Sequence, residues 1–207
     1  MNSLRKSTKL SEKENKVFQQ LDSPIKIQNF LGKLKHNKEK RGETLRSPRE
    51  VLKSGESHCI EGALFAAVSL WYHGQTPLIL DLKSSQYDYD HVVALFQKNG
   101  KWGAISKTNH AILRYRDPVY DSVRELALSY FHEYFLDDGS KTLRSYSDPF
   151  DLSKLPDTRW ITDEKNLWHI SDLLDKSPHR EIINRREVFS LRKADKIEIK
   201  AGKLKEW

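Results

Sequence analysis

The pattern of apolar and polar residues in the middle of the chain predicts a helix, a strand and a hairpin, in that order. Residues 60–72 are rich in alanine and apolar on nearly all sides of a helix, which is typical of a buried helix. Residues 77–82 form a short apolar run between turn residues, which predicts a buried strand. Residues 90–97 predict a second strand, and the Asn-Gly pair after them is a hairpin signal that leads into a returning strand over 101–106.

The flanking segments carry weaker patterns. Residues 1–16 are polar, rich in lysine and without a period, so we expect them to lack regular structure. Residues 35–47 are charged and predict a surface loop, while the tail over 187–207 fits either a strand pair or a helix. Apolar residues at helical spacing predict further helices over 17–21, 24–31, 48–53, 122–135 and 167–174.

Together these elements predict an α+β fold with three parts. Residues 1–47 would form a basic N-terminal arm, partly disordered and partly helical. Residues 48–150 would form the core, in which the buried helix packs on a small antiparallel sheet, and residues 151–207 an extension packed on that core.

The net charge of +7 comes from the N-terminal quarter of the chain. Residues 1–54 contain 14 Lys and Arg against 6 Asp and Glu, whereas the remainder contains 22 against 23. A uniformly basic fold would indicate a nucleic-acid surface, but here a nearly neutral fold carries a basic extension. We therefore interpret the extension as a solvated helical arm, with nucleic-acid binding through it as the alternative.

The sequence favours a cytoplasmic protein that does not enter a membrane. The apolar run over 60–72 is too short for a span and contains Glu61, and the first residues are charged where a signal peptide would be apolar. The chain has a single cysteine, which excludes an internal disulfide and a multi-cysteine metal site. Any chemistry at this cysteine is therefore that of a free thiol.

Cys59 stands where a polar segment with a glycine gives way to the buried helix. Free N–H groups and the dipole at a helix start favour a thiolate, although a free cysteine is often just a small buried residue. His91 begins the second predicted strand. An imidazole within hydrogen-bond reach of the thiol can hold its proton and deliver it to a leaving group.

Four short motifs follow one another in this region. They are Cys59-x-x-Gly62-Ala63-x-x-Ala66-Ala67, Gly74-x-x-Pro77, Asp90-His91-Val92-Val93-Ala94 and Gly100-Lys101-Trp102. In this order and at these separations, over about residues 55–106, the chain resembles the transglutaminase-like branch of the papain-type cysteine enzymes. The resemblance implies a papain/transglutaminase-like core with Cys59 as the nucleophile and His91 as the general base.

The third member of the triad departs from the family pattern. In the family it is usually an Asp on the returning strand, which holds the imidazole in one tautomer, and the hairpin alignment places Ser106 there. Asn109 is the other candidate, because an amide oxygen serves this role in papain-type enzymes. A serine hydroxyl can accept the imidazole N–H but supplies no negative charge.

Four neighbouring residues are given lesser roles. His58 is expected to be an exposed cap residue, although it can also lower the thiol pKa or help to bind the acyl oxygen. Glu61 is expected to be a structural residue favoured by the dipole of the first helical turn, with a position facing the cleft as the lesser alternative. Asp90 points to the strand face opposite His91, so it cannot readily orient that ring, and His110 is expected to be a loop residue near the site.

Neither a metal nor a cofactor is expected. His58, Cys59, His73, Asp90 and His91 are suitable ligand types, but they lack the short helical or loop spacing of a zinc site. The sequence contains neither a Gly-rich phosphate loop nor a Gly-x-Ser-x-Gly elbow.

Two classes of function remain open for the core. The first is a cysteine-dependent amidase, peptidase or acyltransferase that acts on a peptide or amide substrate through a thioester, with hydrolysis favoured over amine transfer. The second is a binding or scaffolding module that keeps the fold and its cleft without turnover.

Overall fold

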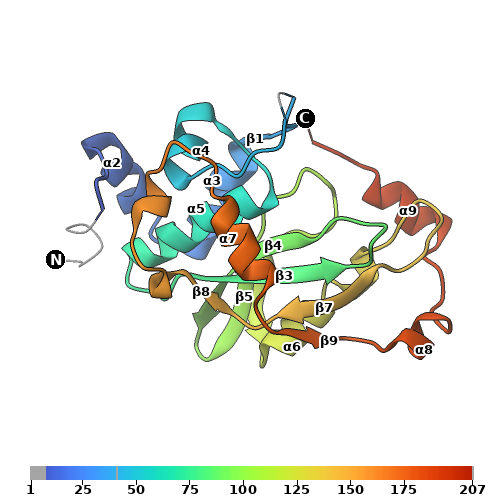
Figure 1. The fold of residues 1–207 in the computed structure, drawn as a ribbon. Helices are drawn as coiled ribbons and strands as arrows, with labels where there is room; N and C mark the ends of the chain where they lie inside the picture. The colour runs from blue at the N-terminus through green and yellow to red at the C-terminus, as the bar shows by residue number, and fades with distance from the viewer. Residues whose placement is uncertain (1–7, 41, 207) are drawn as a thin grey trace.

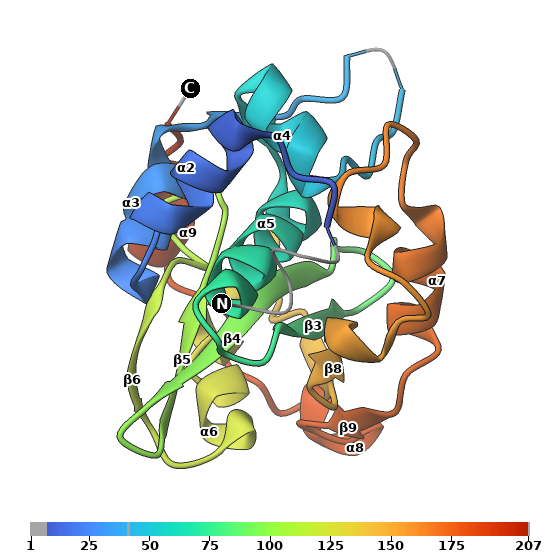
Figure 2. The ribbon, with the colours of Figure 1, turned by 90° about the vertical axis from the view of Figure 1, so that its left-hand side faces the viewer.

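The computed structural model describes residues 8–40 and 42–206, so the expectation for residues 1–7 lies outside the described residues. The fold is α+β, as predicted, with a seven-stranded sheet between two apolar clusters (Figures 1 and 2). The strand order is β6-β5-β4-β3-β7-β9 with β8 also paired to β3, and all these pairs are antiparallel. The strands are β3 (Leu78–Ser84), β4 (His91–Lys98), β5 (Lys101–Ile105), β6 (Arg116–Tyr120), β7 (Leu143–Ser147), β8 (Phe150–Asp151) and β9 (His179–Glu181).

The central helix, α5 (Cys59–Tyr72), is buried along nearly its whole length, as the apolar pattern predicts. It packs on β4 and β3, and α4 (Pro48–Ser54) precedes it. Ser47 caps the start of α4, and Gly55 ends it with a φ of 68°, a left-handed conformation that glycine adopts freely. The chain then runs through β2 (Glu56–Ser57), which pairs in parallel with β1 (Lys35–His36), directly into Cys59.

The N-terminal helices belong to the core, so the expectation of a solvated arm is wrong for them. In Figure 2, α2 (Glu12–Gln20) and α3 (Pro24–Lys33) lie alongside α5, and Phe18 and Leu31 are fully buried in the same apolar cluster. The start of α2 lies inside the segment expected to lack structure. Its Ser11 cap receives a hydrogen bond from the Glu14 amide, and the Glu14 carboxylate accepts one from the Ser11 amide, which explains why a helix begins there.

The helix predicted over 122–135 is wrong in its second half. α6 (Val123–Leu128) is followed only by a short 3₁₀ turn, η1 (Phe131–Glu133). Ser129 Oγ accepts a hydrogen bond from Arg116 Nε at 2.9 Å, and the buried Tyr130 ring packs against the same guanidinium. These contacts with the sheet outweigh the continuing helical pattern.

The chain after β7 crosses the α5 face and then continues beyond the sheet edge (Figure 1). Its helices are η2 (Leu152–Lys154), η3 (Arg159–Ile161), α7 (Trp168–Asp175), α8 (Arg185–Val188) and α9 (Lys196–Gly202). The helix predicted over 167–174 is confirmed as α7, and the tail forms helices, not a strand pair. Among the helices in the described part of the chain, none has the length and apolar character needed to cross a membrane.

The segment that follows β5 approaches α5 closely at Gly62. A Cβ built on Gly62 would lie 2.4 Å from Lys107 Cβ, well inside van der Waals contact. Lys107 cannot swing away easily, because it is buried and its Nζ donates to Leu31 O at 3.0 Å, at the end of α3. Gly62 therefore lets the returning strand deliver residues 106–109 to the start of α5.

We expect Gly62→Ala to lower the free energy of unfolding by about 1–3 kcal/mol, because the added methyl overpacks this contact. Urea unfolding followed by circular dichroism measures the change. Gly32→Ala is the matched control, since a Cβ there meets nothing within 4 Å and alanine is the better helix former. Equal free energies of unfolding for Gly62→Ala and Gly32→Ala would contradict the close approach of Lys107 to Gly62.

Candidate active site

Cys59 is the first residue of α5, and its side chain is partly exposed. The first amides of a helix have no helical acceptor, so they surround the sulfur with N–H groups and the positive end of the dipole. The preceding residue, His58, caps the helix and has an extended backbone. The local sequence therefore places a thiol at a position that favours its anion.

His91 and Ser106 meet across the neighbouring strands β4 and β5. His91 Nε2 lies 2.8 Å from Ser106 Oγ, and both residues are buried. The Ser106 hydroxyl donates its hydrogen to the carbonyl of Leu113, which can only accept. Ser106 Oγ must therefore accept from His91 Nε2–H, which leaves Nδ1 of the imidazole for the thiol.

Gln28, on α3, fixes the backbone of Ser106 in both directions. Its Nε2 donates to Ser106 O at 2.9 Å, and its Oε1 accepts from Ser106 N at 3.0 Å. We call this pair of hydrogen bonds the Gln28 clamp. It sets the position of the hydroxyl that holds His91, and nothing in the sequence near Ser106 indicates it.

The other predicted site residues lie around this group. Asn109 is buried and lines the same cleft, and its backbone carbonyl accepts from Glu206 N at 2.8 Å. The residue hydrogen-bonded to His91 Nε2 is Ser106. Asp90 is exposed and accepts from Ser84 N at 2.7 Å. His110 lines the cleft, with Nδ1 2.9 Å from Gly202 O.

The thiol of Cys59 is electrostatically activated. Burial alone raises its pKa, but hydrogen bonding and attraction from the His58 and His91 side chains outweigh burial and hold the pKa well below its ordinary value. Tyr134 lines the same cleft, and its pKa is raised by burial and by the negative charge of Cys59. The arrangement therefore favours a thiolate between two imidazoles.

Glu61 is fully buried, and its carboxylate accepts hydrogen bonds from the loop that precedes α4. Its carboxylate accepts from Thr44 Oγ1 and from Arg46 N, both at 2.9 Å, and from His58 N at 3.0 Å. Asn37 Nδ2 adds a further contact at 3.1 Å. The prediction that Glu61 stabilises only the helix start is therefore incomplete, since its carboxylate also fixes the loop and the backbone around Cys59.

His58 is partly buried and not an exposed cap residue. Its Nε2 lies 2.9 Å from Thr44 O, 3.4 Å from Glu61 Oε1 and 3.7 Å from Glu39 Oε1. Burial lowers the pKa of His58, but hydrogen bonding to Cys59, with the charges of Cys59 and Glu61, raises it to about 9. The sequence analysis named an effect on the thiol pKa only as the lesser alternative, because the contacts with Thr44 and Glu39 come from a loop elsewhere in the chain.

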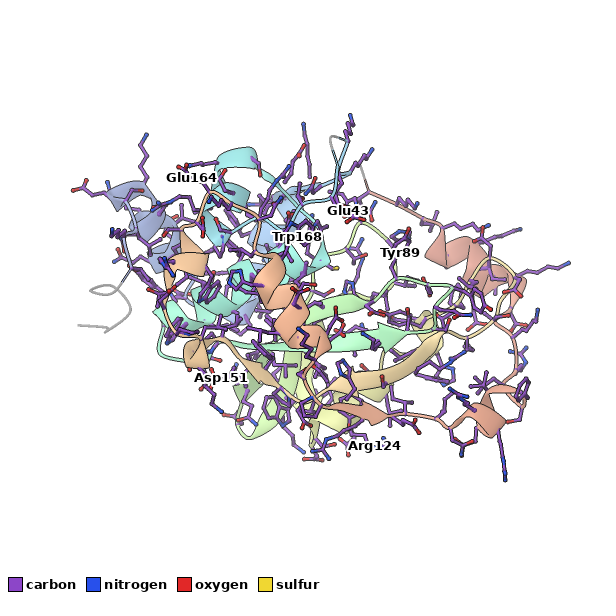
Figure 3. The ribbon with its side chains drawn as sticks, viewed as in Figure 1. Glu43, Tyr89, Arg124, Asp151, Glu164 and Trp168 are labelled. Carbon is purple, nitrogen blue, oxygen red and sulfur yellow. The ribbon has the colours of Figure 1, made fainter. Side chains whose placement is uncertain are left out.

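An open cleft of about 810 Å³ gives access to the thiol. Cys59, His58 and His91 line its inner part. The rim includes Tyr89, whose fully exposed side chain projects from the loop between β3 and β4 (Figure 3), and residues of the C-terminal segment 199–205. That segment is held in place by Ala111 N, which donates to Leu204 O at 3.0 Å.

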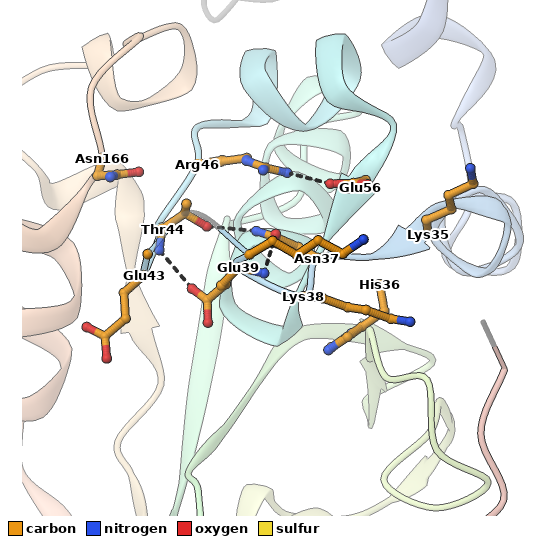
Figure 4. Close-up of a pocket in the computed structure, with 12 residues that line it drawn as sticks. Lys35, His36, Asn37, Lys38, Glu39, Glu43, Thr44, Arg46, Glu56 and Asn166 are labelled. Carbon is orange, nitrogen blue, oxygen red and sulfur yellow. Dashed lines mark hydrogen bonds and ion pairs between the residues drawn. The ribbon is translucent and has the colours of Figure 1, made fainter.

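A second pocket of about 620 Å³ adjoins this cleft (Figure 4). His36 and Glu39 line both cavities and form the border between them. Figure 4 shows the pocket beneath Arg46, which pairs with Glu56 at 3.5 Å. The accessible surface therefore continues past Cys59 in the direction of α4.

A separate group of acidic side chains lies on β3 and its neighbours. Asp81, Asp90 and Asp175 bring oxygens within 4.8 Å of one another, and Lys83 Nζ lies 2.9 Å from Asp175 and 3.5 Å from Asp90. The Lys83 ammonium thus places a positive charge beside these three carboxylates. His73, considered earlier as a ligand type, lies at the other end of α5, with Nε2 2.8 Å from Phe18 O.

Asp81 forms a buried pair with His179. Oδ2 of Asp81 lies 3.1 Å from His179 Nε2, while Oδ1 has no hydrogen-bond partner among the described residues. Burial, with the charge of Asp90, raises the pKa of Asp81 to about 6 against the opposing influence of His179.

Comparison with known proteins does not assign the chain to a protein family. No known family model matches the sequence. A search of curated proteins likewise finds none with significant similarity.

Proposed function

We propose that the chain is a cysteine-dependent acyl-transfer enzyme of the transglutaminase-like, papain-type class, and that it hydrolyses an amide bond through a thioester. The observation that carries this proposal is the buried His91–Ser106 hydrogen bond, together with a thiol at the start of a buried helix whose pKa is lowered by His58 and His91. A merely structural cysteine would not need a buried imidazole with a fixed tautomer beside it.

The chemistry follows from the positions of these groups. The Cys59 thiolate attacks the amide carbonyl, and the first-turn amides of α5 stabilise the oxyanion that forms. His91, which holds the thiol proton on Nδ1, delivers it to the departing nitrogen as the C–N bond breaks. Water then attacks the thioester, His91 takes its proton, and the carboxylic acid leaves as the thiolate is restored.

The shape of the cavity supports a peptide-like substrate. The cleft and the adjoining pocket, about 810 Å³ and 620 Å³, meet at His36 and Glu39 beside the thiol. An extended chain can therefore lie on both sides of the scissile bond. The exposed Tyr89 ring offers an apolar contact at the rim.

The test uses p-nitrophenyl acetate as an acyl donor. We expect a burst of p-nitrophenol and, by mass spectrometry, an acetyl group on Cys59. With p-nitroacetanilide as the donor, whose leaving nitrogen must be protonated, His91→Ala should slow acylation by about 100-fold or more, since general acid–base catalysis contributes at least this much. Cys59→Ala should give no adduct.

The control is His132→Ala, on η1, whose carbonyl accepts from Lys141 and whose side chain does not line the cleft. It should acylate like the wild type. Acylation of Cys59 at the same rate in His91→Ala would contradict the proposed role of the imidazole. An unreactive Cys59 in the wild type would leave a binding module as the better description.

A further inference from the structure

Cys59 has two imidazole neighbours, and the two are held by different partners. His91 is held by a neutral hydroxyl, Ser106 Oγ. His58 is held by the carbonyl of Thr44 at 2.9 Å, with carboxylate oxygens of Glu61 and Glu39 at 3.4 Å and 3.7 Å from the same nitrogen. Negative charge therefore surrounds His58, where the family pattern would have placed it behind His91.

The ring atoms of His58 have defined roles. Thr44 O can only accept, so Nε2 of His58 carries a hydrogen. Nδ1 is the ring nitrogen that Thr44 does not use, and Cys59 is the next residue in the chain. A second hydrogen on Nδ1 makes the ring a cation, which is adjacent in the chain to the Cys59 thiolate and lies 3.4 Å from the buried Glu61 carboxylate.

We infer that His58 is a permanently charged imidazolium that stabilises the Cys59 thiolate, and that Glu61 is the acid that holds this charge. The inference rests on the proposed function and divides its chemistry between the two histidines. His58 keeps its proton throughout, while His91 carries the mobile proton from the thiol to the leaving nitrogen and later from water. The negative charge that Ser106 lacks is thus supplied by Glu61, beside the second imidazole, His58.

The other charged groups near His58 agree with this assignment. His36, on β1, lines the same cleft, and its pKa is lowered by burial, by Lys107 and by the charge of His58. Glu39 approaches from the loop, Glu61 from α5, and Cys59 is adjacent. Three negative groups, on Glu39, Glu61 and Cys59, therefore lie near His58. The neighbouring His36 ring adds little positive charge, because its lowered pKa favours the neutral form.

The first test measures the rate of Cys59 alkylation by iodoacetamide from pH 4 to pH 9. The midpoint of this profile reports the thiol pKa. His58→Gln should raise the midpoint by at least one pH unit, so alkylation falls about tenfold at pH values below the wild-type midpoint. His110→Gln is the matched control, since His110 lines the cleft but is held by Gly202 O, and it should leave the midpoint unchanged.

The second test needs no substitution at the site. In protein labelled with ¹⁵N-histidine, the ring nitrogens of His58 should show the imidazolium signature at pH 7.5. A neutral His58 ring would overturn the inference, as would a His58→Gln variant that folds normally and keeps the wild-type midpoint. A shifted midpoint without any acylation by p-nitrophenyl acetate would instead uphold the role of His58 and defeat the proposed enzyme.

Discussion

Glu61→Ala is expected to lower the free energy of unfolding by about 3–5 kcal/mol, the cost typical of breaking a buried charged network. The carboxylate is fully buried and accepts hydrogen bonds from Thr44, Arg46, His58 and Asn37. Truncation would leave these donors without an acceptor in a site that water does not reach freely. Urea unfolding at pH 7 measures the loss.

Glu56→Ala is the matched control for this prediction. Glu56 is a partly exposed acid on β2, and its nearest ion-pair partner, Arg46, is 3.5 Å away. Such surface pairs contribute about 0–1 kcal/mol. If both variants lost the same small amount, Glu61 would not be the centre of the hydrogen-bonded network, and the assignment of His58 would lose its structural support.

Asp81→Asn is expected to raise stability at pH 7 and to have little effect at pH 4. The pKa of Asp81 is raised to about 6 in the folded chain, from 3.8. The folded state therefore binds more protons than the unfolded state between these values, so the contribution of Asp81 to stability is present at low pH and is lost as the pH rises through about 6. Two pKa units correspond to about 3 kcal/mol.

The measurement is the difference in unfolding free energy between Asp81→Asn and the wild type at pH 4, 5, 6 and 7, in which the titration of groups that do not interact with Asp81 cancels. We expect the difference to grow by about 2–3 kcal/mol across this range, because an Asn side chain can still donate to His179 without carrying charge. Asp175→Asn, whose side chain is largely exposed beside Lys83, should show an almost flat difference. A flat profile for Asp81→Asn would mean that Asp81 ionises normally in the folded protein.

The elements that could be predicted from the sequence are those with local signals. The unbroken apolar pattern of 60–72 identified α5 because a helix buried on every side needs no polar face. The β4–β5 hairpin was also predictable, since Asn99 and Gly100 both have positive φ, which this residue pair adopts readily. Gly55 and Ser47 marked the ends of α4 for similar local reasons.

What could not be predicted depends on contacts between distant segments. The strands β6, β7 and β9 lack a strong alternating pattern and are recruited by the sheet, which is why the expected sheet was too small. In the site, the spacing of motifs pointed to Cys59, His91 and Ser106. Gln28 and the full network of Glu61 had no local signal, because their partners lie in other parts of the chain.

The Gln28 clamp joins two segments that lie far apart in the chain. Gln28 and Ser106 are separated by 78 positions, so the Gln28 clamp can close only after α3 has docked against the finished β4–β5 hairpin. Contacts over such a separation are slow to form, because a long loop must be closed first. Until then the backbone of Ser106, the partner of His91, is not held from the side of α3. On the proposed function, Cys59 would therefore gain its full reactivity only once its cleft has formed.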